Sequence, residues 1–162
     1  MNRSTIILLS VLGGFVLILL WGVGAYNRLV GLSESTESQW ANVQSAYQRR
    51  ADLIPNLVST VKGYADFEKS TLTDVIEARS KATSVQISAD NLTPDKIAEF
   101  QKAQGELKGA LSRLLVSVER YPDLKANQNF LALQSQLEGT ENRINVERDR
   151  FNEQVRTYNS SV

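Results

Sequence analysis

An uninterrupted apolar run from Ile6 to Tyr26, IILLSVLGGFVLILLWGVGAY, constrains the fold of this chain more than any other feature. As an α-helix this run rises roughly 31 Å, which is close to the thickness of the hydrocarbon core of a bilayer. The run carries no charged residue, and Trp21 and Tyr26 stand where aromatic side chains commonly meet a membrane interface. We therefore predict a transmembrane signal-anchor within residues 1–26 that contacts the lipid bilayer through residues 6–26.

A cleaved secretory signal is the main alternative for this segment. Arg3 supplies a short basic region before the run, and Val23-Gly24-Ala25 resembles a small-residue cleavage site. The run is longer than the usual apolar region of a signal peptide, and the cleavage site would fall at its far edge. A retained anchor fits these features better.

The charges that flank the run give a slight preference for one orientation. The α-amino group and Arg3 precede the run, whereas Arg28 follows it beside Glu34 and Glu37. Because positive charges favour the cytoplasmic side of a span, we expect a cytoplasmic N-terminus and an extracytoplasmic domain over residues 27–162.

Composition argues against most catalytic functions. The chain has no histidine and no cysteine, the residues that most often serve as general base, activated nucleophile or zinc ligand. Lys plus Arg and Asp plus Glu both number 18, so no net positive charge attracts nucleic acid. We predict that the protein is not an enzyme, that it has no catalytic, cofactor-binding or metal-binding residues, and that it binds no cofactor and no nucleic acid.

Two pairs of glutamates have the spacing found in di-iron helical bundles. These pairs are Glu34 with Glu37 and Glu138 with Glu141, but neither pair has the histidine that completes such a site. Acidic residues on solvated helix faces explain the same spacing, and we favour that interpretation.

Stripes of apolar residues at steps of three, four or seven predict long helices after the run. A shorter helix is expected from Asp66 through Arg79, followed by a loop over residues 82–92. Charged residues on the last helix, such as Glu147, are expected on its solvated face. The stripes comprise Leu29, Leu32, Thr36, Trp40, Val43, Tyr47, Arg50, Ile54, Leu57, Val61 and Tyr64; Ile97, Phe100, Gln104, Leu107, Leu111, Leu114, Val118 and Tyr121; and Phe130, Leu133, Leu137, Ile144, Phe151, Val155 and Tyr158.

Capping residues and prolines predict where these helices begin and end. Thr93 and Asn127 are suitable N-caps, and Pro122 is expected to end the preceding helix after Tyr121. Pro55 falls inside the first stripe and lacks a backbone N–H, so we expect a kink or a break around residues 51–54.

Four side chains on or beside the first stripe have two interpretations each. Trp40 and Tyr47 could form an aromatic surface for a partner, although core packing is the commoner role of such a stripe. The doubled basic step at Arg49 and Arg50 could bind an acidic partner or a lipid headgroup. We favour a packed Arg50 stem whose guanidinium pairs with a carboxylate, for which Asp52 and Glu119 are candidates.

Together these patterns predict an all-α fold, in which the transmembrane helix continues into an antiparallel up-and-down four-helix bundle with long helices. The expected domains are residues 1–26 and 27–162. In an alternative arrangement, the last two helices form a long hairpin whose stripe also packs on neighbouring copies.

Two sequence segments resemble the LemA family of bacterial membrane proteins. RRADLIPNLV lies within residues 48–80, and VERYPDLKANQNFLALQSQLEGTENRI lies within residues 111–159, which end in RTYN. The resemblance implies a single-span anchor followed by a helical bundle at the bacterial inner membrane, with no enzymatic activity established for the family. It also implies a membrane-organising role, because a related branch serves in magnetosome formation and some members are associated with membrane metalloproteases.

These observations favour a non-enzymatic membrane-anchored scaffold that forms homo-oligomers or organises other membrane proteins, such as a membrane metalloprotease. The alternative is a monomeric membrane-tethered sensor or adaptor, which transmits partner or ligand binding through the helix kinked at Pro55.

Overall fold

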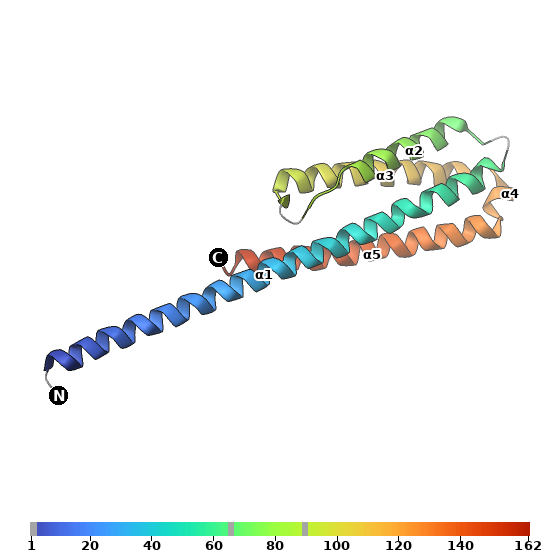
Figure 1. Ribbon diagram of the computed structural model, residues 1–162. Coiled ribbons are helices and arrows are strands. Elements are labelled where there is room, and N and C mark those ends of the chain that lie inside the picture. The colour runs from blue at the N-terminus through green and yellow to red at the C-terminus, as the bar shows by residue number, and fades with distance from the viewer. Residues whose placement is uncertain (1–2, 65–66, 89–90) are drawn as a thin grey trace. The chain divides into compact units, whose positions relative to one another are not determined.

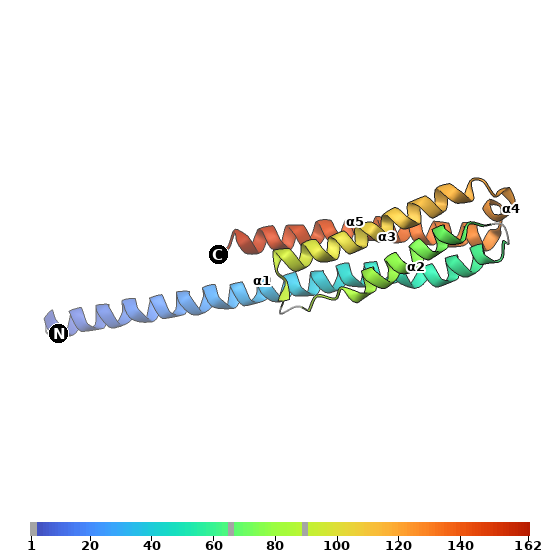
Figure 2. The same cartoon turned by 90° about the horizontal axis from the view of Figure 1, so that it is seen from above.

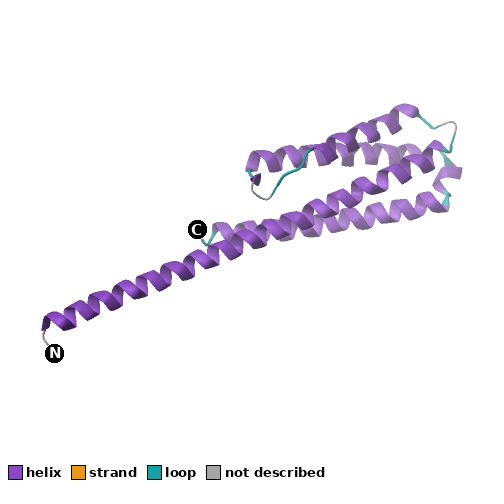
Figure 3. Cartoon of the chain, in the orientation of Figure 1, coloured by secondary structure: helices purple, strands orange, loops and turns teal. Residues whose placement is uncertain are grey.

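The fold is all-α, as the sequence predicts. The computed structural model describes residues 3–64, 67–88 and 91–162, apart from the side chains of residues 3 and 5–11. Every regular element within these ranges is a helix (Figure 3). In chain order the helices are α1 (Arg3–Lys62), α2 (Lys69–Ser84), α3 (Pro94–Val118), α4 (Pro122–Lys125) and α5 (Gln128–Asn159) (Figure 1).

The chain divides into two compact units. The central unit comprises Trp40–Asp149, and the terminal unit comprises Met1–Gln39 with Arg150–Val162. Helices α1 and α5 each contribute residues to both units, whereas α2, α3 and α4 lie within the central unit.

The central unit is an antiparallel bundle of α2, α3 and the parts of α1 and α5 that belong to it. Successive long helices run in opposite directions, and both views show them side by side (Figures 1 and 2). The core contains large apolar side chains that are fully enclosed, and burying each one stabilises the fold by about 1.5–3 kcal/mol. These side chains include Ile54, Leu57, Leu107, Leu114, Leu124, Phe130 and Ile144.

The aromatic residues of the first stripe belong to this core. Trp40 and Tyr47 are 3% and 6% exposed, which confirms the packing interpretation. Both rings meet the ring of Phe100 edge-on, with centroids 5.4 Å and 5.1 Å apart. This edge-to-face arrangement suits the opposite charges of a ring's edge and face, so α1 and α3 are locked in register here.

Both predicted N-caps form. Thr93 Oγ1 accepts a hydrogen bond from Lys96 N, and Asn127 Oδ1 accepts one from Phe130 N at 3.1 Å. The predicted end of α3 is wrong, because the helix stops at Val118 and Pro122 instead begins α4. The helix ends in a tighter turn before the proline is reached, because the N–H groups of residues 119–121 donate to carbonyls three residues earlier rather than four.

Asp66, the expected start of the second helix, lies outside the described residues, and α2 begins at Lys69.

Glu147 was expected on a solvated face but is 6% exposed, so that expectation is wrong. It follows Ile144 by three residues and therefore shares the buried face of α5, where its Oε1 lies 3.8 Å from Arg143 Nε.

Of the kink or break expected near Pro55, the break does not occur, because α1 is helical without interruption from Arg3 to Lys62, and the kink stays a prediction. A proline at position 55 leaves the carbonyl of Ala51 without its helical N–H partner. Arg79 of α2 replaces that partner: its Nε donates to Ala51 O at 2.8 Å. A neighbouring helix thus supplies the hydrogen bond that the proline removes.

The terminal unit contains two helical stretches, one from α1 and one from α5. Ser35 Oγ donates to Gln154 Oε1 at 3.2 Å between them. Phe151 is buried, but the other apolar stripe residues of this unit are only half-buried: Leu29, Leu32, Val155 and Tyr158. Two stretches thus cover this part of the stripe incompletely.

The large apolar side chains described between Leu12 and Tyr26 are exposed on every face of α1. They are 46–77% exposed. Among the described residues, α1 is the one helix long and apolar enough to cross a membrane. Exposure on all sides is what a lipid environment requires of a spanning helix, so this segment is the candidate membrane span.

Candidate functional site

A buried arginine joins three helices at the centre of the central unit. Arg50 on α1 is 3% exposed, as its place on the apolar stripe predicts. Its Nη1 donates to Glu141 Oε2 on α5 at 3.0 Å. Its Nη2 donates to the carbonyl and to the side-chain Oε1 of Gln104 on α3, at 2.9 Å and 2.8 Å.

The carboxylate that pairs with Arg50 is not one of the two candidates from the sequence. Asp52 instead accepts a hydrogen bond from Gln48 on the same helix, and Glu119 pairs with Lys125. The partner, Glu141, lies four residues after Leu137 and three before Ile144. That spacing places Glu141 on the core-facing side of α5, and it could have identified Glu141 as a candidate partner of Arg50 from the sequence.

Glu141 is held in its charged form. It also accepts a hydrogen bond from Lys108 Nζ at 2.6 Å. Burial alone would raise the pKa of Glu141, but the bond from Lys108 and the charge of Arg50 outweigh burial and hold that pKa below its ordinary value. Burial lowers the pKa of Arg50, although an arginine stays protonated throughout the accessible pH range.

The ring of Tyr47 completes the surroundings of Arg50. The guanidinium carbon lies 5.1 Å from the ring centroid, which is within range of a cation–π contact. Burial raises the pKa of the Tyr47 hydroxyl, against the opposing charges of Arg148 and Arg50, so the ring stays neutral. Arg50 Nε is buried without a partner among the described residues. The cluster therefore clamps helices together and offers no free base or nucleophile.

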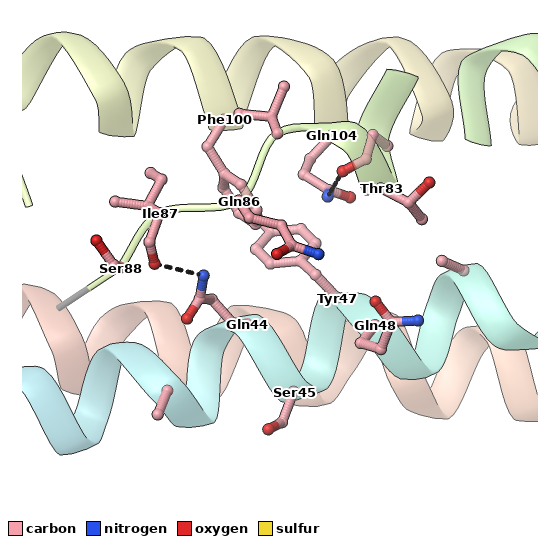
Figure 4. Close-up of a pocket in the computed structure, with 14 residues that line it drawn as sticks. Gln44, Ser45, Tyr47, Gln48, Thr83, Gln86, Ile87, Ser88, Phe100 and Gln104 are labelled. Carbon is pink, nitrogen blue, oxygen red and sulfur yellow. Dashed lines mark hydrogen bonds between the residues drawn. The ribbon is translucent and has the colours of Figure 1, made fainter. Parts of the chain in front are cut away.

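A second feature is an open groove of about 610 Å³ beside this cluster, formed by α1, α3 and the segment from Ala82 to Ser88. Figure 4 shows the side chains of Gln44, Gln48 and Gln86 around it, with the rings of Tyr47 and Phe100 between the helices. None of the 14 residues drawn is charged. The groove therefore offers hydrogen-bonding groups without a net charge.

Three side-chain hydrogen bonds hold the wall that residues 82–88 form, which includes the end of α2. Gln44 Nε2 and Trp40 Nε1 both donate to the carbonyl of Ile87, at 2.9 Å and 3.4 Å. Gln104 Nε2 donates to the carbonyl of Ala82 at 3.1 Å. The sequence predicts this segment only as a loop. Ile87 is an apolar residue in a polar stretch, which could have indicated that the segment packs against the bundle, and it is 4% exposed.

The acidic residues with di-iron spacing do not form a metal centre in the part of the chain that the structure describes. No group of three or more His, Cys, Asp or Glu side chains converges there. Glu141 is engaged by Arg50 and Lys108, and Glu138 accepts a hydrogen bond from Gln134.

The features above define a class of protein: an all-helical membrane protein with one candidate span at its N-terminus and a bundle clamped by a buried ion pair. Within that class the chain belongs to the LemA family, whose family profile matches residues 39–162.

Curated relatives agree with this assignment. Protein LemA of Metamycoplasma hominis is 26% identical over 140 residues, covering 86% of this chain and 60% of the relative. Magnetosome protein MamQ of Magnetospirillum gryphiswaldense is 26% identical over 156 residues, covering 85% of this chain and 57% of the relative. A MamQ protein of Paramagnetospirillum magneticum is 25% identical over the same length. The chain thus spans less than two thirds of the length of these relatives.

Proposed function

We propose that this protein is a non-enzymatic scaffold that is anchored in the bacterial inner membrane and assembles through its terminal unit. The observation that carries the proposal is the half-covered stripe of that unit. Leu29 and Leu32 on α1, and Val155 and Tyr158 on α5, remain partly exposed, whereas in the central unit the stripes of these two helices are buried except at Tyr64 and Leu133.

A second copy of the chain is the occupant that suits this face. Two amphipathic helices cover each other on one side only, and a further helix with the same spacing of apolar residues completes the packing. Copies held in one bilayer share an orientation and a high local concentration, which favours such pairing. The resulting assembly would in turn bind and organise other membrane proteins, such as a membrane metalloprotease.

The alternative of a monomeric sensor that flexes at Pro55 has weaker support. Its hinge depended on a kink or break in the first helix. Helix α1 is unbroken there, and Arg79 supplies the hydrogen bond that Pro55 cannot make.

The mass of the detergent-solubilised full-length protein, measured by light scattering, tests the proposal. We expect a discrete oligomer. Val155→Asp, which places a charge on the half-buried stripe, should reduce it to a monomer, whereas Val116→Asp should not, because Val116 is 72% exposed on α3. A monomeric full-length protein would overturn the proposal. A version that starts at Asn27 shows whether the anchor contributes to assembly.

We also propose that residues 27–162 lie on the extracytoplasmic side. Because the chain has no cysteine, a single Ser59→Cys substitution at an exposed position gives an unambiguous label site. A membrane-impermeant maleimide should modify it in intact cells with the outer membrane opened. Modification only after complete lysis would place the domain in the cytoplasm.

A further inference from the structure

We propose that the groove between α1, α3 and the segment 82–88 binds an extended, uncharged peptide, whose main chain lies alongside Gln86 and Ile87. This inference does not depend on self-assembly. The groove has no charged lining residue, in contrast to the cavity of about 540 Å³ that is lined by Asp74, Lys81 and Arg113.

The lining selects against charged ligands. All 14 residues are uncharged in a chain in which 22% of residues carry a charge. A charged group placed here would lose hydration without gaining an ionic partner, which is costly. A ligand made of neutral, hydrogen-bonding units avoids that cost, and a peptide main chain is such a ligand.

The groove presents the hydrogen-bonding groups that a peptide main chain needs. Each glutamine amide on its rim, at positions 44, 48 and 86, can donate and accept. Gln86 is exposed, and its N–H makes no hydrogen bond to any described residue. An extended segment with unused main-chain groups is the receptor in β-strand addition, in which main-chain bonds provide affinity and pockets select side chains.

The segment that would pair with the peptide, residues 82–88, is already held in place without a ligand. Val85 has extended backbone angles, φ −86° and ψ 98°. The carbonyl of Ile87 is tied to α1 by Gln44 and Trp40, and the carbonyl of Ala82 is tied to α3 by Gln104. Binding therefore does not have to order this edge, which lowers the entropic cost of association.

The dimensions of the groove suit a short peptide. Its volume of about 610 Å³ lies within the range of about 300–1,000 Å³ that is typical of ligand sites. The non-helical stretch of residues 85–88 can lie beside a strand of similar length at about 3.3 Å per residue. Ala41 and Ser45 are small and lie one turn apart on α1, so they leave room for side chains of the peptide.

The test uses full-length protein in detergent and two pools of fluorescent, end-blocked hexapeptides. One pool contains Ala, Ser, Thr, Val and Gln; the matched pool replaces two positions with Glu or Lys. We expect saturable binding of the neutral pool by fluorescence polarisation, with at least about tenfold weaker binding of the charged pool. Failure of the neutral pool to bind, or equal binding of both pools, would overturn the proposal.

Two pairs of variants show whether the peptide binds in the groove and whether it uses the main chain of the protein. Ser45→Arg fills the groove and should abolish binding, whereas Ser59→Arg, on an exposed position of α1 outside the groove, should not. Gln86→Pro removes the main-chain N–H and should weaken binding at least about tenfold, whereas Gln86→Ala keeps the N–H and should weaken it less. Circular dichroism checks that each variant is folded.

Two results, one from a variant and one from a different ligand, would count against the assignment of a peptide to this groove. Undiminished binding to Ser45→Arg would place the peptide elsewhere on the protein. Saturable binding of maltohexaose in the groove, with no binding of either peptide pool, would make the ligand a neutral glycan and overturn the peptide proposal.

Discussion

Helix α5 contributes to both units, and its stripe is buried to different degrees in each. In the central unit Phe130, Leu137 and Ile144 are 2–7% exposed, and of the stripe residues there Leu133 is half-buried. In the terminal unit Phe151 is buried, but Val155 and Tyr158, which continue the same pattern, are half-buried. The spacing of a stripe therefore defines which face of a helix is apolar, and the number of neighbouring helices decides how completely that face is covered.

The two units also differ in how polar groups join their helices. The central unit buries a charged contact, Arg50 with Glu141, which is secured by Gln104 and Lys108. The terminal unit has a neutral contact between Ser35 and Gln154. A buried charge is tolerated only where partners surround it, so the central unit should be the more sensitive of the two to substitution.

The largest expected effect comes from placing a charge in the closed core. Leu114→Asp should cost about 4 kcal/mol or more of the total stability, which is about 5–15 kcal/mol for a typical domain, because Leu114 is fully buried. Val116→Asp, two residues away on the exposed face of α3, should change stability by less than about 0.5 kcal/mol. Urea unfolding followed by circular dichroism measures both, and an unchanged midpoint for Leu114→Asp would show that this position is not core.

Breaking the buried ion pair should have the next largest effect. Glu141→Gln leaves the charge of Arg50 buried without its countercharge, and we expect a loss of about 3 kcal/mol. This is at the low end for a buried pair, because Gln104 still accepts from Arg50 and the Glu141 side chain is 27% exposed. The double variant Arg50→Met/Glu141→Leu removes both charges and should recover most of the loss in urea unfolding. No recovery would mean that the charges themselves stabilise the bundle.

Acid should weaken the same contact without any substitution. The folded-state pKa of Glu141 lies below its ordinary value, so the unfolded chain takes up a proton on this group more readily than the folded chain. The stabilisation is therefore complete above the ordinary pKa of a glutamate, about 4.3, and is lost as pH falls through the folded-state value. The stability of Glu141→Gln should change less over that range. Parallel pH profiles of both proteins would contradict the assignment.

Much of the bundle could be predicted from local patterns. The stripes, the caps at Thr93 and Asn127, and the burial of Trp40 and Tyr47 all follow from side-chain type and spacing within one helix. Periodicity also placed Arg50 on the apolar face. These features need no knowledge of which helix lies opposite.

The remaining features depend on contacts between segments that are distant in sequence. The partner of Arg50 is 91 positions away, and the N–H that replaces the missing one at Pro55 comes from another helix. The groove exists because α1 and α3 fix the carbonyls of Ile87 and Ala82. Local propensity has no information about such partners, so the break near Pro55 and the pairing with Asp52 or Glu119 were wrong for the same reason.

The replacement of the missing hydrogen bond at Pro55 can be tested by a double-mutant cycle. Arg79→Met should cost about 1–3 kcal/mol, because it leaves the partly buried Ala51 carbonyl without a donor. In a Pro55→Ala background, residue 55 regains its N–H and can bond to that carbonyl along the helix, so the same substitution should cost about half as much or less. Equal costs in both backgrounds, measured by urea unfolding, would show that Arg79 acts independently of the proline.

The smallest expected effect is a change in hydrogen exchange along α5, which compares its central part with its last turns. Hydrogen exchange of the full-length protein should show slow exchange for the central part of α5 and, if neighbouring copies cover the stripe, continued protection through residues 151–158. Val155→Asp should remove the covering copy and speed exchange of that last stretch about tenfold or more, while amides around Leu137 and Ile144 keep their rates. Unchanged exchange near Tyr158 would mean that contacts within a single chain already protect the terminal unit. The half-buried stripe would then be its final state rather than a surface for assembly.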